Sequence, residues 1–196
     1  MRMTAFDYTA IFIGIVVALA VENVAVSFHK LLELGPKVRW HWMAPATAVI
    51  ASVTTLGSFW LLWNARAEVG QDRSFFVWLP FAVNYVLLFL ATAASLPDEI
   101  PQEGIDLRTY YFENRRYWIL TLLYFCSVVA MDTLSILRPE WGFIVVRRDP
   151  LFFAGCLTAI AGAMSVLLIR KPAWHAAWIA ISIVLLVAVL GPVRVG

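Results

Sequence analysis

Six apolar stretches, each close to the length of a helix that crosses a membrane, constrain this chain more than any other feature. They cover residues 8–28, 43–63, 75–96, 117–137, 151–169 and 173–190. A helix needs ~20 residues to cross ~30 Å of hydrocarbon. With 62% hydrophobic residues and a mean hydropathy of +0.80, the 196-residue chain has little left for a separate soluble domain. The sequence therefore predicts an all-α polytopic membrane protein, in which residues 1–196 form a single transmembrane domain that is a bundle of six transmembrane helices.

Charge and composition exclude several classes of function. The net charge is +2 and the basic residues are scattered over the predicted loops, so no nucleic-acid partner is expected. No histidine lies deep inside a segment to ligate haem, and no segment contains a lysine that could hold retinal. The sequence thus predicts no cofactor and favours a protein without enzyme activity. Lys and Arg are almost evenly divided between the two sides, and only the compact basic first loop favours a cytoplasmic position for the odd-numbered loops.

The third predicted loop, residues 97–116, is the longest. Its second half mixes aromatic and charged residues. This composition suits a short helix lying in the membrane interface, with rings in the acyl boundary and guanidinium groups on lipid phosphates. Arg108, Arg115 and Arg116 are therefore candidate lipid-headgroup contacts. The alternative is that these residues only anchor the start of the fourth transmembrane helix.

Two loops also carry a pattern shared with other proteins. It consists of Pro97-Asp98, Asp106-Leu107-Arg108, Tyr111-Phe112 and Asn114-Arg115-Arg116 in the third loop, and of Val38-Arg39-Trp40-His41-Trp42 in the first loop. In these residues the chain resembles an uncharacterised family of bacterial six-transmembrane-helix membrane proteins with no assigned activity. The resemblance implies the six-helix architecture and a multi-pass protein of the bacterial inner membrane. It implies no functional residue.

Only two charged residues, Glu22 and Asp132, lie inside the apolar stretches. An acidic side chain within a transmembrane helix costs several kcal/mol unless it is paired, hydrated or protonated, so each is a functional candidate. Glu22 lies ~9 Å from one membrane face and Asp132 ~7.5 Å from the other, with Asn84 between them in depth. Glu22, Asn23, Asn84 and Asp132 are therefore predicted stations for a proton or small cation. The alternative is that the carboxylates snorkel to the headgroups and the amides hold helices together.

The spacing of residues around these acids predicts which helix faces point inward. On the first segment, three- and four-residue spacing places one small-residue face, with the carboxylate, towards neighbouring helices: Gly14, Ala18, Glu22, Ala25 and His29. On the fourth segment a comparable stripe contains Thr121, Tyr124, Val128, Asp132 and Ser135.

The three histidines, His29, His41 and His175, fall on the same predicted side of the membrane. With a nearby carboxylate they could bind zinc or another transition metal, and this reading makes the chain a metal-dependent membrane enzyme. Their spacing matches no known metal motif, and histidine near a membrane interface commonly serves as an amphipathic anchor.

The sequence leaves three functions open. The leading hypothesis is a small channel or proton/cation pathway through the polar intramembrane residues. The alternative is a structural or accessory subunit of a larger membrane complex that contacts lipid headgroups, and the metal-dependent enzyme comes third. Small residues at four-residue spacing on the second and fifth segments allow close helix packing, either inside one chain or between subunits. Besides the lipid bilayer, the expected partners are further copies of the chain, in a homo-oligomer, or other membrane proteins.

Overall fold

The computed structural model describes residues 5–64, 75–137 and 150–191. These residues form seven α-helices: α1 (Ala5–Leu34), α2 (Met43–Asn64), α3 (Phe75–Ala93), α4 (Leu107–Glu113), α5 (Arg115–Leu137), α6 (Pro150–Leu168) and α7 (Pro172–Leu190). The six long helices coincide with the six predicted apolar stretches to within three residues, except at the end of α1. There the helix continues to Leu34 and stops because Gly35 adopts a left-handed φ of 48° and Pro36 follows. The seven basic residues on the predicted side of the termini and the even-numbered loops lie outside the described residues.

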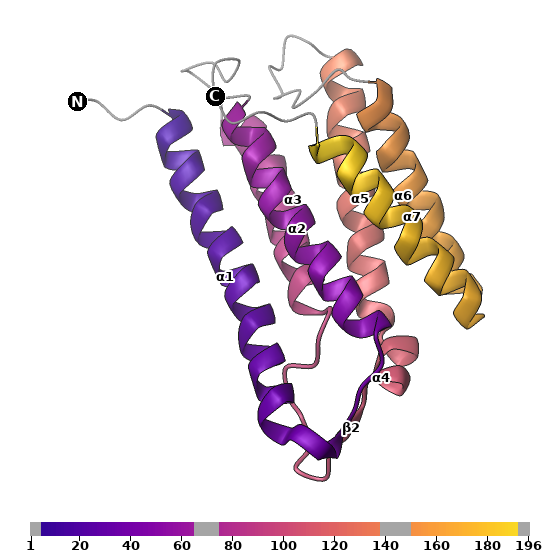
Figure 1. Ribbon diagram of the computed structural model, residues 1–196. Coiled ribbons are helices and arrows are strands. Elements are labelled where there is room, and N and C mark those ends of the chain that lie inside the picture. The colour runs from indigo at the N-terminus through magenta and orange to yellow at the C-terminus, as the bar shows by residue number, and fades with distance from the viewer. Residues whose placement is uncertain (1–4, 65–74, 138–149, 192–196) are drawn as a thin grey trace.

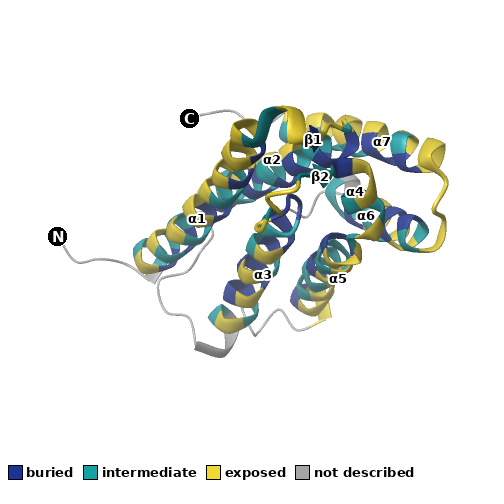
Figure 2. Cartoon of the chain, turned by 90° about the horizontal axis from the view of Figure 1, so that it is seen from below, coloured by how far each residue is buried: buried dark blue, intermediate teal, exposed yellow. Residues whose placement is uncertain are grey.

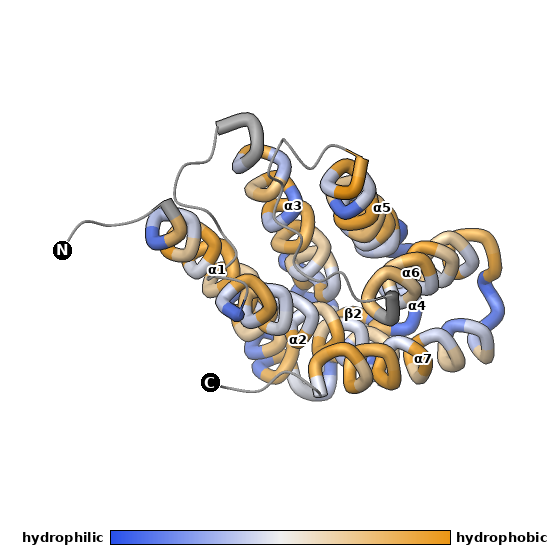
Figure 3. Tube along the Cα trace, turned by 90° about the horizontal axis from the view of Figure 1, so that it is seen from above, coloured by the Kyte–Doolittle hydropathy of each residue, from blue (hydrophilic) through white to orange (hydrophobic). Residues whose placement is uncertain are grey.

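Four helices, α1, α2, α5 and α7, are long and apolar enough to cross a membrane. The described apolar parts of α3 and α6 are shorter, Trp78–Ala93 and Phe152–Leu168. Figure 3 shows that hydrophobic residues dominate the long helices. Large aliphatic side chains lie on the outer surface as well as inside, and Leu168 and Val184 are 78% and 67% exposed. An outer surface of this kind suits contact with lipid, so the four helices indicate a membrane protein.

The long helices are arranged as a ring with one helix outside it. α2 packs against α3, α3 against α5, α5 against α6, α6 against α7, and α7 back against α2. α1 packs on the outside of this ring, against α2 and α3 (Figure 3). Figure 2 shows that the buried positions of the helices face their neighbours in this arrangement. The ring therefore has an interior to which five helices contribute.

One end of the molecule is closed by the first and third loops (Figure 1). A short 3-10 helix, η1 (Gly35–Lys37), leads into β1 (Val38–Arg39), which pairs in parallel with β2 (Ile105–Asp106). Gly104 has a φ of 108° and lies so close to the Lys37 carbonyl oxygen that a Cβ atom has no room. These contacts fix the two loops to each other.

The short helix expected in the second half of the third loop is confirmed as α4. It begins after Asp106, whose Oδ1 accepts hydrogen bonds from the backbone N–H groups of Arg108 (2.8 Å) and Thr109 (3.5 Å). Its buried residues, Leu107 and Tyr111, join an apolar core that also contains Trp118 of α5 and Trp178 of α7. α4 thus packs beneath the ring at the end where the first and third loops meet.

Candidate functional site

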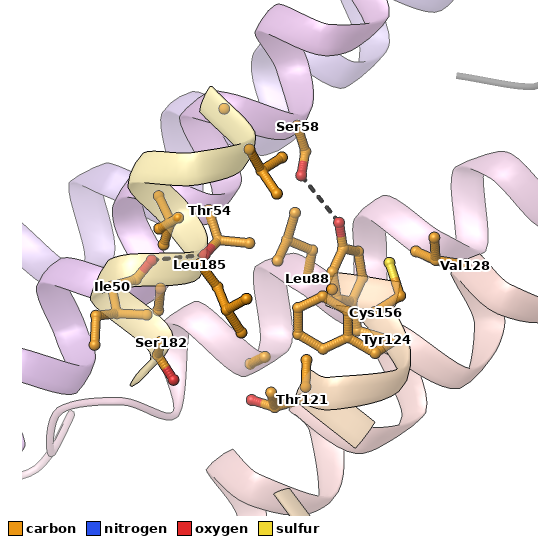
Figure 4. A pocket seen from close by; sticks show the side chains of 18 of the residues that line it. Ile50, Thr54, Ser58, Leu88, Thr121, Tyr124, Val128, Cys156, Ser182 and Leu185 are labelled. Carbon is orange, nitrogen blue, oxygen red and sulfur yellow. Dashed lines mark hydrogen bonds between the residues drawn. The ribbon is translucent and has the colours of Figure 1, made fainter. Parts of the chain in front are cut away.

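The interior of the ring contains a cavity of about 190 Å³. α2, α3, α5, α6 and α7 all contribute to its wall, whereas α1 contributes no residue. The wall is mostly aliphatic and aromatic, and Leu88, Val128 and Leu185 point into the space drawn in Figure 4. The polar side chains among the lining residues are Thr47, Thr54, Ser58, Asn84, Tyr85, Thr92, Tyr117, Thr121, Tyr124, Asp132, Cys156 and Ser182. This is an apolar chamber with a limited number of polar positions.

Small residues allow the helices to approach closely around the cavity. At Gly162 of α6, the Trp178 indole of α7 occupies the place where a Cβ atom would stand. At Gly57 of α2, an added Cβ atom would come within 2.7 Å of Leu190 of α7. Gly57 and Gly162 thus serve packing inside the chain, and this use explains part of the small-residue spacing seen in the sequence.

Several of the hydroxyl groups that line the cavity, those of Thr47, Thr54, Thr92 and Ser182, donate to carbonyl oxygens of their own helices. Thr54 Oγ1 donates to Ile50 O (2.8 Å), and Ser182 Oγ donates to Trp178 O (2.9 Å). The hydroxyl oxygens keep free lone pairs, so towards the cavity they act chiefly as hydrogen-bond acceptors.

A set of hydrogen bonds also crosses between helices at mid-depth. Ser58 Oγ of α2 and Tyr124 Oη of α5 are 2.9 Å apart, as Figure 4 shows, and Tyr85 Oη of α3 donates to Ser58 O (2.9 Å). Asn84 Nδ2 of α3 donates to Ser127 Oγ of α5 (3.0 Å). These bonds connect α2, α3 and α5 across the interior.

Among the described residues that line the cavity, Asp132 is the only acidic one, and its side chain is buried on α5. Within the described parts of the chain, no hydrogen-bond donor or cation contacts its carboxyl group; Ser135 Oγ instead donates to the Asp132 backbone oxygen (2.6 Å). Burial of a charged carboxylate without a partner is costly. A molecule in the cavity that donated a hydrogen bond or carried a positive charge would offset this cost.

The structure separates the four residues that the sequence suggests as one pathway. Asn84 and Asp132 both line the cavity, whereas Glu22 and Asn23 lie on α1, which does not reach it. Glu22 is exposed on the outer face of α1. Asn23 is half-buried, and its Oδ1 atom has no hydrogen-bond partner within residues 5–64, 75–137 and 150–191. Glu22 and Asn23 therefore do not belong to the same site as Asn84 and Asp132.

The predicted inward face of α1 is wrong, and that of α5 is largely confirmed. Ala18, Glu22, Ala25 and His29 are all exposed. The buried face of α1 instead includes Ile13, Val17, Ala20, Ser27 and Leu31. Ile13 and Val17 belong to a second apolar core with residues of α2 and α3. On α5, the stripe predicted from the sequence lines the cavity with Thr121, Tyr124, Val128 and Asp132.

The three histidines are not gathered into one site. His29 Nε2 lies 3.3 Å from Glu33 Oε1 on exposed α1, and His41 stacks on Trp42 in the first loop. Within the described residues, no group of three His, Cys, Asp or Glu is placed so that it could hold a metal ion. The metal site suggested by the sequence is therefore not formed by His29, His41 and His175.

His175 instead connects α7 to α4. Its Nε2 lies 2.9 Å from the backbone oxygen of Ile169, which can only accept, so this nitrogen carries the proton. Its Nδ1 lies 3.1 Å from Tyr111 Oη and accepts from it. Burial raises the pKa of the Tyr111 phenol above its usual range, so the donor stays protonated. His175 is a structural link between the ring and the third loop.

The three candidate headgroup arginines have different surroundings. Arg115 lines a shallow hollow together with Arg170, which the sequence reasoning had not connected with it. Arg116 lies near Tyr110, whose pKa is raised by burial and by Asp98, while the Arg116 charge partly opposes that rise. Arg108 is exposed on α4. The arginines of the third loop therefore do not form one cluster.

Comparisons with models of known protein families, with curated proteins and with solved structures found no match. The resemblance to a bacterial six-helix family consequently stays an expectation. What the fold defines is an all-α chain with four helices able to cross a membrane and a chamber lined by five of its helices.

Proposed function

We propose that this chain is a multi-pass membrane protein whose six long helices all cross the bilayer, and that it binds a small lipophilic molecule inside the ring. α3 and α6 each have 19 residues, which span ~28 Å at 1.5 Å per residue, close to the ~30 Å hydrocarbon thickness. Each packs against α5, which is itself long enough to cross. These lengths and contacts support six crossings.

The chemistry of the cavity wall favours an occupant with an apolar body and one donor group. A cavity of about 190 Å³ is similar in size to an apolar cavity of ~150 Å³ that binds benzene, so it has room for one small organic molecule. The aliphatic and aromatic wall offers few partners for water, and the hydroxyl oxygens offer acceptors. The observation that carries the proposal is the buried Asp132 carboxyl group, which faces this space without a partner among the described residues. A lipophilic amine fits both the wall and the acid.

The test compares binding of a six-carbon amine with binding of the matching alcohol to the full chain in detergent. Trp118 and Trp178 line the cavity, so quenching of intrinsic fluorescence, supported by calorimetry, reports occupancy. Asp132→Asn is expected to weaken amine binding about tenfold or more, because hydrogen bonds to charged groups are worth ~1.5–3 kcal/mol. It should change alcohol binding much less.

Glu22→Gln is the matched control, since it removes an acid of the same class from a helix that does not line the cavity. Ala159→Leu, which adds bulk to the cavity wall, should lower binding of both compounds. The proposal is wrong if the unmodified protein binds neither compound, or if Glu22→Gln weakens amine binding as much as Asp132→Asn does.

A second candidate is a proton or cation pathway that uses Asn84 and Asp132 without Glu22. It is favoured by one observation: both residues line the same chamber as the hydroxyls of Ser58 and Tyr124. Flux measured in proteoliposomes distinguishes the two candidates. The pathway requires flux that Asp132→Asn abolishes and Glu22→Gln preserves, whereas a binding protein shows amine binding without such flux.

A further inference from the structure

A shallow hollow on the α4 side of the molecule brings together two arginines from distant parts of the chain. Arg115 is the first residue of α5, and Arg170 follows the end of α6. Both line the hollow, and both are exposed. The remaining lining residues are Tyr111, Phe112, Asn114, Trp118, Val166, Leu167 and His175, none of which is acidic. The hollow therefore concentrates positive charge.

Neither arginine is neutralised within the described residues. The ion pair found there joins His29 and Glu33 on α1, away from this hollow. Arg115 also stands at the start of a helix, where the helix dipole is positive and disfavours a cation. Two guanidinium groups and a helix start thus repel one another around one small space, and an anion placed between them would relieve that repulsion.

Among the described residues that line the hollow, the polar side chains that can accept a hydrogen bond already have partners within the chain. His175 is occupied by Tyr111 and by the Ile169 carbonyl group, and Asn114 Oδ1 accepts from the backbone N–H of Tyr117 (3.4 Å). The walls include Val166, which is 3% exposed, and Leu167. The arrangement has a charged rim above an apolar wall. That combination matches a molecule with an anionic head and an apolar tail.

We propose that Arg115 and Arg170 form a binding site for an anionic phosphate group, with the headgroup of a membrane lipid as its source. The guanidinium group of an arginine donates two parallel hydrogen bonds to the oxygens of one phosphate, which a lone surface charge does not do. The hollow is only about 20 Å³ in volume, so the phosphate lies at its rim and not inside it. Arg116 and Arg108 take no part in this site. The site is independent of the cavity inside the ring.

The experiment is native mass spectrometry of the full chain in detergent with added phosphatidylglycerol, phosphatidylcholine or inorganic phosphate. The unmodified protein should retain phosphatidylglycerol in preference to phosphatidylcholine. Arg115→Gln and Arg170→Gln should each lower that preference about fivefold, which corresponds to ~1 kcal/mol for one arginine near an anionic surface. Arg115→Lys keeps the positive charge but loses the forked guanidinium group. Its preference for phosphatidylglycerol should therefore lie between that of the unmodified protein and that of Arg115→Gln.

Arg116→Gln is the matched control, because Arg116 is the next residue on the same helix and does not line the hollow. Thermal unfolding checks that each variant stays folded, as expected for exposed side chains. Displacement of the lipid by equimolar inorganic phosphate would assign the same site to a soluble phosphate. The proposal is overturned if the unmodified protein shows no preference for the anionic species, or if Arg116→Gln reduces binding as much as Arg115→Gln.

Discussion

Replacement of Gly162 by alanine is expected to displace the Trp178 indole, because the added Cβ atom would overlap the ring. The overlap involves three ring atoms, so a small rotation of the side chain does not remove it. Overpacking of this kind typically costs ~1–3 kcal/mol. Alanine regains up to ~1 kcal/mol because glycine is a poor helix former. The net expectation is a loss of ~0–2 kcal/mol in the free energy of unfolding.

The same helix supplies a matched control. At Gly155 an added Cβ atom would meet only Val189, at 3.9 Å, which is ordinary contact. Gly155→Ala therefore gains helix propensity without overlap and should stabilise the protein by ~0.5–1 kcal/mol. Gly162→Ala and Gly155→Ala are chemically identical substitutions on one helix, yet Gly162→Ala should be the less stable variant.

Thermal and denaturant unfolding in detergent, followed by circular dichroism, measures both changes in stability. Trp178 borders the cavity, so its displacement in Gly162→Ala should also shift the tryptophan emission and reduce amine binding. Equal stabilisation by Gly162→Ala and Gly155→Ala would refute the reasoning, since it would mean that the indole does not lie against the α6 backbone.

Three further substitutions test other contacts. His175→Ala removes the hydrogen bond to Tyr111 of α4 and the one to the carbonyl oxygen of Ile169, which follows α6, so it should cost ~2–3 kcal/mol and raise hydrogen exchange in α4. His29→Ala, at an exposed position of α1, should change stability by less than ~0.5 kcal/mol. Tyr124→Phe removes the contact with Ser58 and should lower the free energy of unfolding by ~1 kcal/mol. Burial raises the pKa of Tyr110, so its contribution to stability should be complete below pH ~10 and decline at higher pH, and a pH titration of Tyr110→Phe should lack that decline.

Hydropathy located the helices well because each apolar stretch is a local property of the chain. It did not locate the inner face of α1, where the small residues around Glu22 point outward and Ile13 and Val17 point inward. In lipid both faces of a helix are in apolar surroundings, so the spacing of apolar residues carries little information about burial. The pattern of small residues therefore does not predict which face of α1 is buried.

The cavity itself could not be predicted, because it depends on how five helices close into a ring. One part of the cavity wall can nevertheless be predicted from the sequence. On α5, three- and four-residue spacing joins Thr121, Tyr124, Val128 and Asp132, and polar groups at membrane depth face protein in preference to lipid. A comparable spacing on α2, through Thr47, Thr54 and Ser58, would have shown a second wall.

The two acids inside the apolar stretches require compensation from different places. Asp132 lines the chamber and its carboxyl group has no partner among the described residues, so a hydrogen-bond donor that entered the chamber would stabilise it. Glu22 lies on the outer face of α1, so its compensation comes from outside the ring, through snorkelling to the headgroups or through a further membrane partner. Because Glu22 lies on α1, which contributes no residue to the chamber, Asp132→Asn and Glu22→Gln should affect separate properties of the protein. If both substitutions changed one property equally, that property would depend on how the whole bundle sits in the membrane and not on the chamber.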